Sequence, residues 1–186
     1  ETLNNYKNDC SNDVFFALSH GVHRGSLKSR TVDDREIFIK KLIEKSKDIK
    51  FDIFGINRVQ PIWADQYFKT ISNSKMGLNL SRGQPIKYYS SDRITQITGN
   101  GLVTLIDEKT GYRDFFNDKE MIFYKNLSDL SEKISKISQD EKLRKSVGKN
   151  GKEKYLKYFN STLVAEFIIN KSFDINNKNF YLWHNR

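Results

Sequence analysis

Cysteine and proline are scarce in this sequence, and long apolar runs are absent from it. The single cysteine, Cys10, excludes an internal disulfide, and no closely spaced cysteines and histidines suggest zinc. No apolar stretch approaches the roughly 20 residues that span a bilayer, and the first residues lack a signal-peptide core. We therefore expect a cytoplasmic protein without a bound metal. Because the chain opens abruptly at Glu1, a preceding segment is compatible with it.

The composition is that of a folded chain. Hydrophobic residues make up 37% and charged residues 30%, with only 2 Pro and 10 Gly, a balance typical of globular proteins and not of disordered ones. A length of 186 residues favours one hydrophobic core over two small ones. We expect one domain over residues 13–173, an N-terminal extension over residues 1–12 and a loosely attached tail over residues 174–186.

Positive charge is in clear excess. The chain has 32 Lys plus Arg against 23 Asp plus Glu, a formal net charge of +9. This excess points to an anionic partner, which can be a nucleic acid, an anionic membrane surface or a diphosphate. The alternative is a lysine-rich compositional habit without functional meaning.

Hydrophobic periodicity predicts strands that alternate with helices. Short apolar runs predict strands over residues 13–18, 51–56, 76–80, 102–106 and 121–124. Helical spacing predicts helices that begin at Asp33 or Asp34, Trp63, Ser90 or Ser91, Ser128, Asp140, and Ser161 or Thr162. Alternation implies parallel pairing through right-handed crossovers. The expected fold class is therefore α/β, a Rossmann-like three-layer sandwich with a parallel sheet and C-terminal helices, and ligands bind at the carboxyl edge of such sheets.

The loop after the first expected strand, residues 19–30, combines glycines with basic side chains. It contains Gly21, His23, Arg24 and Lys28. Glycine lets the backbone approach a ligand closely, and cationic side chains hold a pyrophosphate through charge-assisted hydrogen bonds. The alternative is a solvated basic loop without a ligand.

The loop after the third expected strand, residues 81–93, also carries groups that suit a nucleotide. It contains Arg82, Tyr88, Tyr89, Ser90, Ser91 and Arg93. Guanidinium groups supply charge, hydroxyls supply hydrogen bonds, and tyrosine rings supply a stacking face. In the alternative interpretation the tyrosines pack on the sheet edge and Arg93 pairs with Asp92 or Asp114.

The order of these segments resembles a known family. The segments are KMGLNLSRG at 75–83, DRITQITGNGLVTLID at 92–107, FYKNLSDLSEKI at 123–134 and LRKSVGKNGKEKYLKYF at 143–159. From residue 75 to about residue 159 the chain resembles the donor-binding C-terminal domain of group-one glycosyltransferases, especially the spore-maturation-protein-like branch. The resemblance covers roughly half of the chain and implies one half of a GT-B fold.

The resemblance implies the binding of a nucleoside-diphosphate sugar as donor substrate, with no other cofactor. It implies diphosphate contacts from Gly21, His23, Arg24, Lys28 and Arg93, and nucleotide or sugar contacts from Arg82, Tyr88, Tyr89, Ser90, Ser91, Gln96 and Gly101. In the family a glutamate on the short helix grips the ribose, and Gln96 takes its place here. Tyr88 stands where retaining members have a second glutamate. No catalytic residue is assigned.

The implied reaction is hexosyl transfer to an acceptor, in the making of cell-envelope polysaccharide. The acceptor domain of a GT-B enzyme lies N-terminal to the donor domain and is missing here, so we expect this chain alone to be inactive. A non-catalytic nucleotide- or sugar-binding module of the same fold is the alternative that Gln96 and Tyr88 suggest. A nucleic-acid-binding domain is a weaker alternative, because no recognised nucleic-acid motif is present. Contact with the inner face of an anionic membrane is compatible with the charge.

Overall fold

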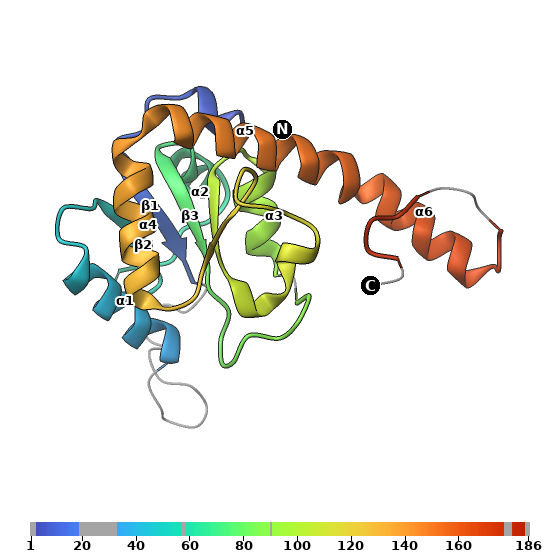
Figure 1. Ribbon diagram of the computed structural model, residues 1–186, viewed down its shortest axis with the longest axis horizontal. Helices are drawn as coiled ribbons and strands as arrows, with labels where there is room; N and C mark the ends of the chain where they lie inside the picture. The colour runs from blue at the N-terminus through green and yellow to red at the C-terminus, as the bar shows by residue number, and fades with distance from the viewer. Residues whose placement is uncertain (1–2, 19–32, 57–58, 90, 177–179, 185–186) are drawn as a thin grey trace.

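The chain folds into a three-layer α/β domain with a long helical extension. The computed structural model describes residues 3–18, 33–56, 59–89, 91–176 and 180–184. In Figure 1 helices lie on both sides of a central sheet, and the C-terminal helices run away from it. The predicted Rossmann-like α/β class is confirmed.

The described residues form a parallel sheet with the strand order β2-β1-β3-β4-β5. The strands are β1 (Asn12–Ala17), β2 (Phe51–Phe54), β3 (Ser74–Asn79), β4 (Val103–Asp107) and β5 (Ile122–Tyr124). All the pairings are parallel, for example Phe16 with Ile53 and Leu105 with Ile122. Every strand therefore ends at the same edge of the sheet.

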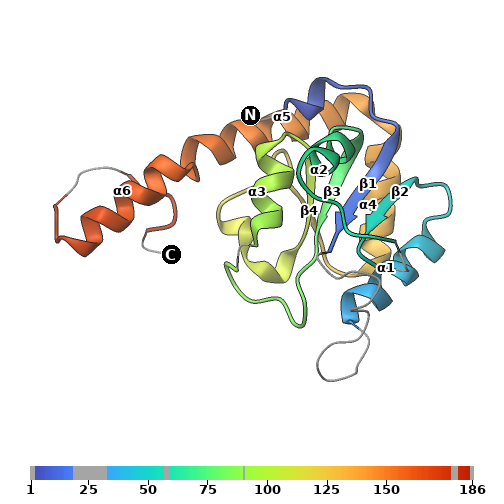
Figure 2. The ribbon, with the colours of Figure 1, turned by 180° about the vertical axis from the view of Figure 1, so that it is seen from behind.

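Helices cover both faces of this sheet. The helices are α1 (Asp34–Lys45), α2 (Ala64–Ile71), α3 (Asp92–Gly99), α4 (Leu127–Gln139), α5 (Glu141–Tyr158) and α6 (Ser161–Ser172), with short 3-10 turns η1 (Asn5–Lys7), η2 (Glu108–Thr110) and η3 (Tyr112–Asp114). Figure 1 shows α1 and α4 on the face toward the viewer, and Figure 2 shows α2 and α3 on the opposite face. Crossovers between parallel strands require this arrangement.

The helix starts agree with the sequence, and the caps differ in part: Ser91 stands at the N-cap of α3, but its side chain makes no capping hydrogen bond. Asp33 caps α1 as predicted, since its carboxylate accepts a hydrogen bond from the Arg35 amide. The α4 and α6 helices are capped by Asn126 and Asn160, whose side chains each accept a bond of 3.0 Å from an amide three residues ahead. The predicted start of α6 at Ser161 is confirmed, whereas the predicted cap of α4, Ser128, lies two residues after the actual cap. Asparagine is as good a cap as serine.

The core lies on both faces of the sheet, as strand β1 shows. Val14 and Phe16 join the cluster under α1 and α4, whereas Phe15 joins the cluster under α2 and α3. These three side chains are fully buried. Burial on both faces explains why β1 is a continuous apolar run, as in sheets covered by helices on both sides.

Helix α3 packs very closely on strand β3. A Cβ at Gly77 would lie 2.6 Å from a side-chain carbon of Ile97, so any larger residue would push the helix away from the sheet. Since α3 begins at the carboxyl edge of the sheet, this contact sets the distance between the start of α3 and the end of β3.

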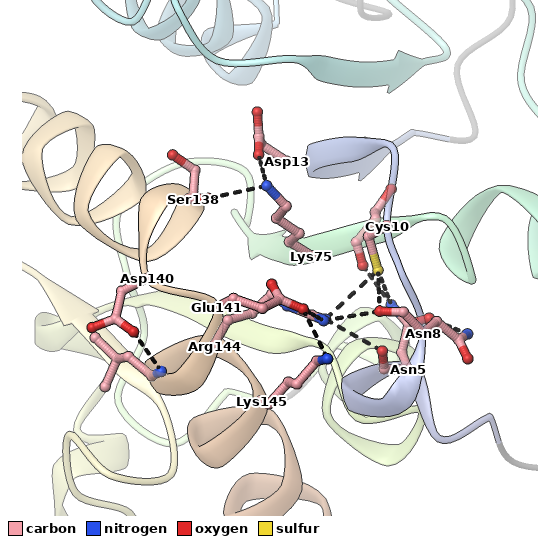
Figure 3. Close-up of polar contacts among 12 residues, drawn as sticks. Asn5, Asn8, Cys10, Asp13, Lys75, Ser138, Asp140, Glu141, Arg144 and Lys145 are labelled. Carbon is pink, nitrogen blue, oxygen red and sulfur yellow. Dashed lines mark hydrogen bonds and ion pairs between the residues drawn. The ribbon is translucent and has the colours of Figure 1, made fainter.

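At the amino edge, a buried arginine joins helix α5 to the N-terminal segment (Figure 3). The Arg144 side chain is 1% exposed and forms an ion pair with Glu141. Its guanidinium also donates to the carbonyl oxygens of Asn8 at 2.9 Å and Asn5 at 3.3 Å. A buried cation is tolerable when its donors are satisfied in this way. The N-terminal segment is therefore packed on the domain.

Helix α6 and the last described residues carry aromatic side chains that continue the core cluster around Phe115 and Phe116 through Phe159. None of the α6 residues is buried, and Figures 1 and 2 show α6 at the far end of α5, away from the strands. Trp183 packs on Phe159 and Phe167 at ring distances of 5.5 and 6.0 Å. The described part of the tail is thus attached more firmly than the sequence indicated. Among the described residues, no helix has the length and apolarity needed to cross a membrane.

We expect the substitution Arg144→Met to lower the free energy of unfolding by about 3 kcal/mol, because the carbonyls of Asn5 and Asn8 lose their donor. Urea denaturation measures this loss. The matched control is Lys145→Met, which removes a more exposed partner of the same Glu141, and it should change stability by no more than about 0.5 kcal/mol. Equal effects of the two substitutions would contradict the role assigned to Arg144.

Candidate functional site

The described residues at the carboxyl edge of the sheet form three adjoining pockets. The aromatic pocket, of about 400 Å³, is lined by Ala17, Leu18, Ile62, Trp63, Ala64, Tyr67, Phe68, Ser91, Asp92, Arg93 and Gln96. The arginine pocket, of about 330 Å³, is lined by Arg35, Ser81, Arg82, Gln84, Ile86, Tyr89, Ser91 and Arg93. The tyrosine pocket, of about 220 Å³, is lined by Asp34, Arg35, Phe38, Asn79, Leu80, Ser81, Gly83, Pro85, Ile86, Tyr89, Asp107, Thr110 and Tyr124.

The three pockets follow one another along the edge. Ser91 and Arg93 line both the aromatic and the arginine pocket. Arg35 and Tyr89 line both the arginine and the tyrosine pocket. A ligand longer than one pocket can therefore extend from the first into the second without leaving the protein surface.

Arg93 occupies the boundary between the aromatic and the arginine pocket. One guanidinium nitrogen, Nη1, donates to the Leu80 carbonyl at 3.0 Å and to the Ser91 hydroxyl at 3.5 Å. The guanidinium carbon lies 5.2 Å from the centre of the Phe16 ring. Helix α3 and the end of β3 thus hold Arg93 in one orientation.

Arg93 forms no ion pair with a carboxylate within the described part of the chain, so the alternative pairing with Asp92 or Asp114 is not formed, although the charge of Asp92 lies near enough to act on the Arg93 pKa. Burial, and then the neighbouring Arg35 guanidinium, lower the pKa of Arg93. Arginine nevertheless keeps its proton in proteins. A partly buried cation beside a second cation favours the binding of an anion between them.

Arg35 is held in the arginine pocket by the cap of helix α1. Its Nε and Nη2 atoms donate to the two carboxylate oxygens of Asp33, at 2.9 and 2.6 Å. These hydrogen bonds keep the pKa of Asp33 well below its usual range. Such a bidentate pair fixes the guanidinium plane. Arg82, in the loop after β3, adds an exposed third guanidinium to the pocket.

The aromatic pocket offers flat apolar surfaces beside polar groups. Trp63, Tyr67 and Phe68 come from the start of α2 and its first two turns, and Gln96 comes from the middle of α3. The Tyr67 ring packs edge-on against Phe15 at 5.3 Å, and burial raises the pKa of Tyr67 to about 12. The Trp63 side chain is 64% exposed. Rings of this kind stack on a nucleobase, and an amide such as that of Gln96 bonds hydroxyl groups.

The structure gathers five of the residues predicted from sequence. Arg82, Tyr89, Ser91, Gln96 and Arg93 all line the aromatic or the arginine pocket. Gly21, His23, Arg24, Lys28 and Ser90 lie outside the described residues, so their predicted contacts stay predictions. Arg93 is therefore the described member of the predicted diphosphate group.

Tyr88 and Gly101 are not brought to the pockets. Tyr88 has a left-handed backbone, with φ at +60°, and its hydroxyl donates to Asp114 while its ring lies 5.0 Å from that of Phe115. The alternative interpretation, in which Tyr88 and Tyr89 pack on the sheet edge, therefore fails for Tyr89, which lines two pockets, while Tyr88 packs on the η3 turn and Phe115. Gly101 lies at the opposite edge of the sheet, because α3 runs from the carboxyl to the amino edge. A Cβ at Gly101 would lie 2.8 Å from the Tyr6 ring.

Sequence reasoning missed Arg35 and the α2 aromatics as site residues. Arg35 stands among acidic residues at a helix start and resembles an ordinary solvent-exposed residue. Trp63, Tyr67 and Phe68 share one face of a helical period, a pattern that is typical of a packing surface. Their positions just after the strands of a parallel sheet were the available signal. In the parts of the chain that the structure describes, no three His, Cys, Asp or Glu side chains form a group that could hold a metal ion.

A family model described as glycosyl transferase-like matches residues 30–170, which is most of the chain. The chain belongs to this glycosyl transferase-like family. The predicted recognition of a group-one glycosyltransferase C-terminal domain is thereby confirmed, and the spore-maturation branch stays a prediction. No curated protein sequence matches the chain.

Solved structures show the fold of this family member. TarM of S. aureus, in complex with fondaparinux, alpha-GlcNAc-glycerol and UDP, is 14% identical with a TM-score of 0.62 over 88% of this chain and 36% of TarM. A glycosyltransferase from Rickettsia africae is 12% identical with a TM-score of 0.62, over 92% of this chain and 50% of that protein. The C-terminal domain of the group 1 glycosyl transferase LpcC from Francisella tularensis is 12% identical with a TM-score of 0.51, over 83% and 89%. The chain thus spans half or less of the length of the first two.

We expect Asp33→Asn to lower the free energy of unfolding by about 2 kcal/mol at pH 7, because the Arg35 guanidinium loses its carboxylate while the helix cap remains. The native pKa of Asp33 is depressed, so its contribution is complete above the unfolded pKa of about 3.9 and is lost as the pH falls. The difference between the native protein and the variant should therefore shrink below about pH 5. Thermal denaturation across this range measures it.

The control for this prediction is Asp118→Asn. Asp118 pairs with Arg113 at the surface, where both side chains are substantially exposed, and its loss should change stability by no more than about 0.5 kcal/mol. A difference at Asp33 that stays the same at about pH 2.5 and at pH 7 would mean that charge is not the stabilising factor.

Proposed function

We propose that this chain is the nucleotide-sugar-binding domain of a glycosyltransferase. The observation that carries the proposal is the continuity of the aromatic and arginine pockets through Arg93. One pocket suits a nucleoside and the next suits a diphosphate, in the order in which these parts are joined in a nucleotide sugar.

The contacts that we assign follow from the chemistry of each pocket. The base stacks on the aromatic side chains that begin helix α2, and the ribose hydroxyls bond to the Gln96 amide. The diphosphate lies beside Arg93, Arg35 and Arg82, whose guanidinium groups match phosphate oxygens in geometry and charge. UDP is the first ligand to test, because the TarM structure contains UDP.

The same arrangement serves the transfer reaction. When the bond between the sugar and the diphosphate breaks, negative charge grows on the departing phosphate oxygens. Guanidinium groups that already point at those oxygens stabilise this charge without having to reorganise. We assign a catalytic role to none of the described residues.

Transfer needs a further domain in our proposal. Helix α6 supports this view, because Ile168 and Ile169 are 57% and 51% exposed and Phe173, which follows the helix, is 75% exposed. Apolar surface of this kind marks an interaction site more often than free surface. We assign it to the domain that holds the acceptor, consistent with the greater length of TarM and the Rickettsia enzyme.

The cellular setting is part of the proposal. We place the chain in the cytoplasm, where its positive charge can contact the inner face of an anionic membrane. We also propose that the chain takes part in the synthesis of cell-envelope polysaccharide. Binding to vesicles that contain an anionic phospholipid, and its loss in high salt, tests the membrane contact.

We expect Arg93→Ala to weaken UDP binding at least about tenfold, because a charged hydrogen-bond donor to phosphate is lost from a partly buried site. Calorimetry with UDP, GDP and dTDP, and with their sugars, measures the affinity. Arg113→Ala is the control, since Arg113 pairs with Asp118 and lines none of the three pockets. If no nucleotide binds to the folded chain at millimolar concentration, the proposal fails.

A non-catalytic binding module of the same fold is the second candidate. Tyr88 favours it, because the side chain at the place of a family glutamate is turned to Asp114 and away from the pockets. The two candidates differ in turnover. Sugar transfer by a polypeptide that also carries the acceptor domain, abolished by Arg93→Ala, would exclude the binding module.

We expect the double substitution Ile168→Asn with Ile169→Asn to leave the stability of this chain unchanged within about 0.5 kcal/mol, because both side chains face solvent. The same substitutions should destabilise a polypeptide in which the acceptor domain covers α6. Paired thermal denaturation of the two polypeptides makes the comparison. Destabilisation of the short chain itself would show that α6 is packed within this domain.

A further inference from the structure

The Tyr124 hydroxyl is a buried polar group without a hydrogen-bond partner among the described residues. Tyr124 is the last residue of β5, is 1% exposed and lines the tyrosine pocket. Burial raises its pKa. Buried hydroxyls in native proteins are nearly always paired, because an unpaired one loses its bonds to water without replacement.

Packing alone does not account for this hydroxyl. The Tyr124 ring lies 6.3 Å from that of Phe38 and belongs to the apolar cluster between the sheet and α1. A phenylalanine would make the same ring contacts without the desolvation penalty. The hydroxyl is therefore explained by a group that enters the tyrosine pocket and bonds to it.

A carboxylate stands beside the hydroxyl. Asp107 is the register partner of Tyr124 on the neighbouring strand and lines the same pocket. Its Oδ1 atom accepts a bond of 2.9 Å from the Lys109 amide, and its Oδ2 atom has no hydrogen-bond partner within the described residues. A ligand with two adjacent hydroxyl groups can donate one hydrogen bond to the Asp107 carboxylate and form a second hydrogen bond with the Tyr124 hydroxyl.

The rest of the pocket defines the ligand further. The pocket volume of about 220 Å³ is several times the roughly 30 Å³ that one water molecule occupies. It is smaller than the pockets that bind drug-sized ligands, so it suits a small molecule. The apolar lining from Phe38, Leu80 and Ile86 suits the flat side of a small ring. An anionic ligand is disfavoured in this pocket for two reasons. The carboxylates of Asp34 and Asp107 repel it, and the positive charge of Arg35 is already paired with Asp33.

We propose that the tyrosine pocket is a second binding site, for the ring of a single neutral sugar that is not attached to the nucleotide. The aromatic pocket and the tyrosine pocket share no lining residue. They lie at opposite ends of the arginine pocket, on opposite faces of the sheet. The site therefore fits a separate saccharide, bound beside the diphosphate region, and it does not require the nucleoside contacts proposed above.

The test is a titration of the isotope-labelled chain with neutral methyl glycosides, followed by amide NMR. Methyl glucoside, methyl galactoside and the methyl glycoside of N-acetylglucosamine are the probes, with and without UDP. For a ligand of this size a dissociation constant in the millimolar range is expected. Amide shifts should be confined to the segments that line the pocket, which are the start of α1 and residues 79–89, 107–110 and 122–126.

Tyr124→Phe should weaken this binding about fivefold, the loss of one neutral hydrogen bond, and should leave the thermal stability of the free chain equal or higher. Tyr155→Phe is the control. Its hydroxyl is paired with Thr95 at 2.8 Å, away from the tyrosine pocket, so the substitution should leave glycoside binding unchanged.

Four results would overturn the proposal. The first is that no glycoside shifts these amides, which would leave only water in the pocket. The second is that Tyr124→Phe leaves the glycoside affinity unchanged. The third is that Tyr124→Phe destabilises the free chain, which would mean that the hydroxyl has a partner within the protein. The fourth is a shift of these amides by a nucleotide sugar but by no free glycoside, which would assign the pocket to the donor sugar. Glycoside binding that persists in Arg93→Ala supports this site even if the nucleotide proposal fails.

Discussion

The parallel sheet is the constraint on which the rest of this structure depends. Parallel strands can be joined only by crossovers, and the crossovers bring every strand end to one edge. The loops after β3 and β4, the end of β1 and the starts of α1, α2 and α3 therefore meet there, although they are far apart in the sequence. The three pockets are a consequence of this meeting. The amino edge has the opposite task, since the buried Arg144 and the N-terminal segment close the domain there.

Two arginines at the carboxyl edge differ in whether a carboxylate pairs with them. Arg35 is neutralised by Asp33, whereas Arg93 makes hydrogen bonds only to a carbonyl and a hydroxyl within the described residues. Keeping a cation there without a carboxylate lowers stability, because burial disfavours the charged form. The same arrangement leaves the guanidinium ready for an anion. Sites of this kind exchange some stability for binding, and the proposed diphosphate contact fits this pattern.

The two ends of the edge differ in chemistry because they lie on different faces of the sheet. Helices α2 and α3 bring aromatic side chains and the Gln96 amide to one face, and α1 with the ends of β4 and β5 brings carboxylates and a phenol to the other. The loop after β3 passes between them and carries the arginine pocket. A transferase that joins a nucleotide-bound sugar to a saccharide needs two such chemistries close together. The two proposed binding sites would supply both on one domain.

The sequence by itself determined the alternation of elements, the parallel sheet and the edge at which the strands end, because apolar periodicity is local and crossovers have only one common hand. It also predicted five residues that the structure brings to the pockets at this edge: Arg93, Gln96, Ser91, Tyr89 and Arg82. Only the tertiary structure decided that Arg35 faces Arg93, that Tyr88 turns to Asp114, and that the Tyr124 hydroxyl is buried without a partner. These facts depend on which side chains meet across the sheet edge. That distance information is not contained in the spacing of residues along one segment.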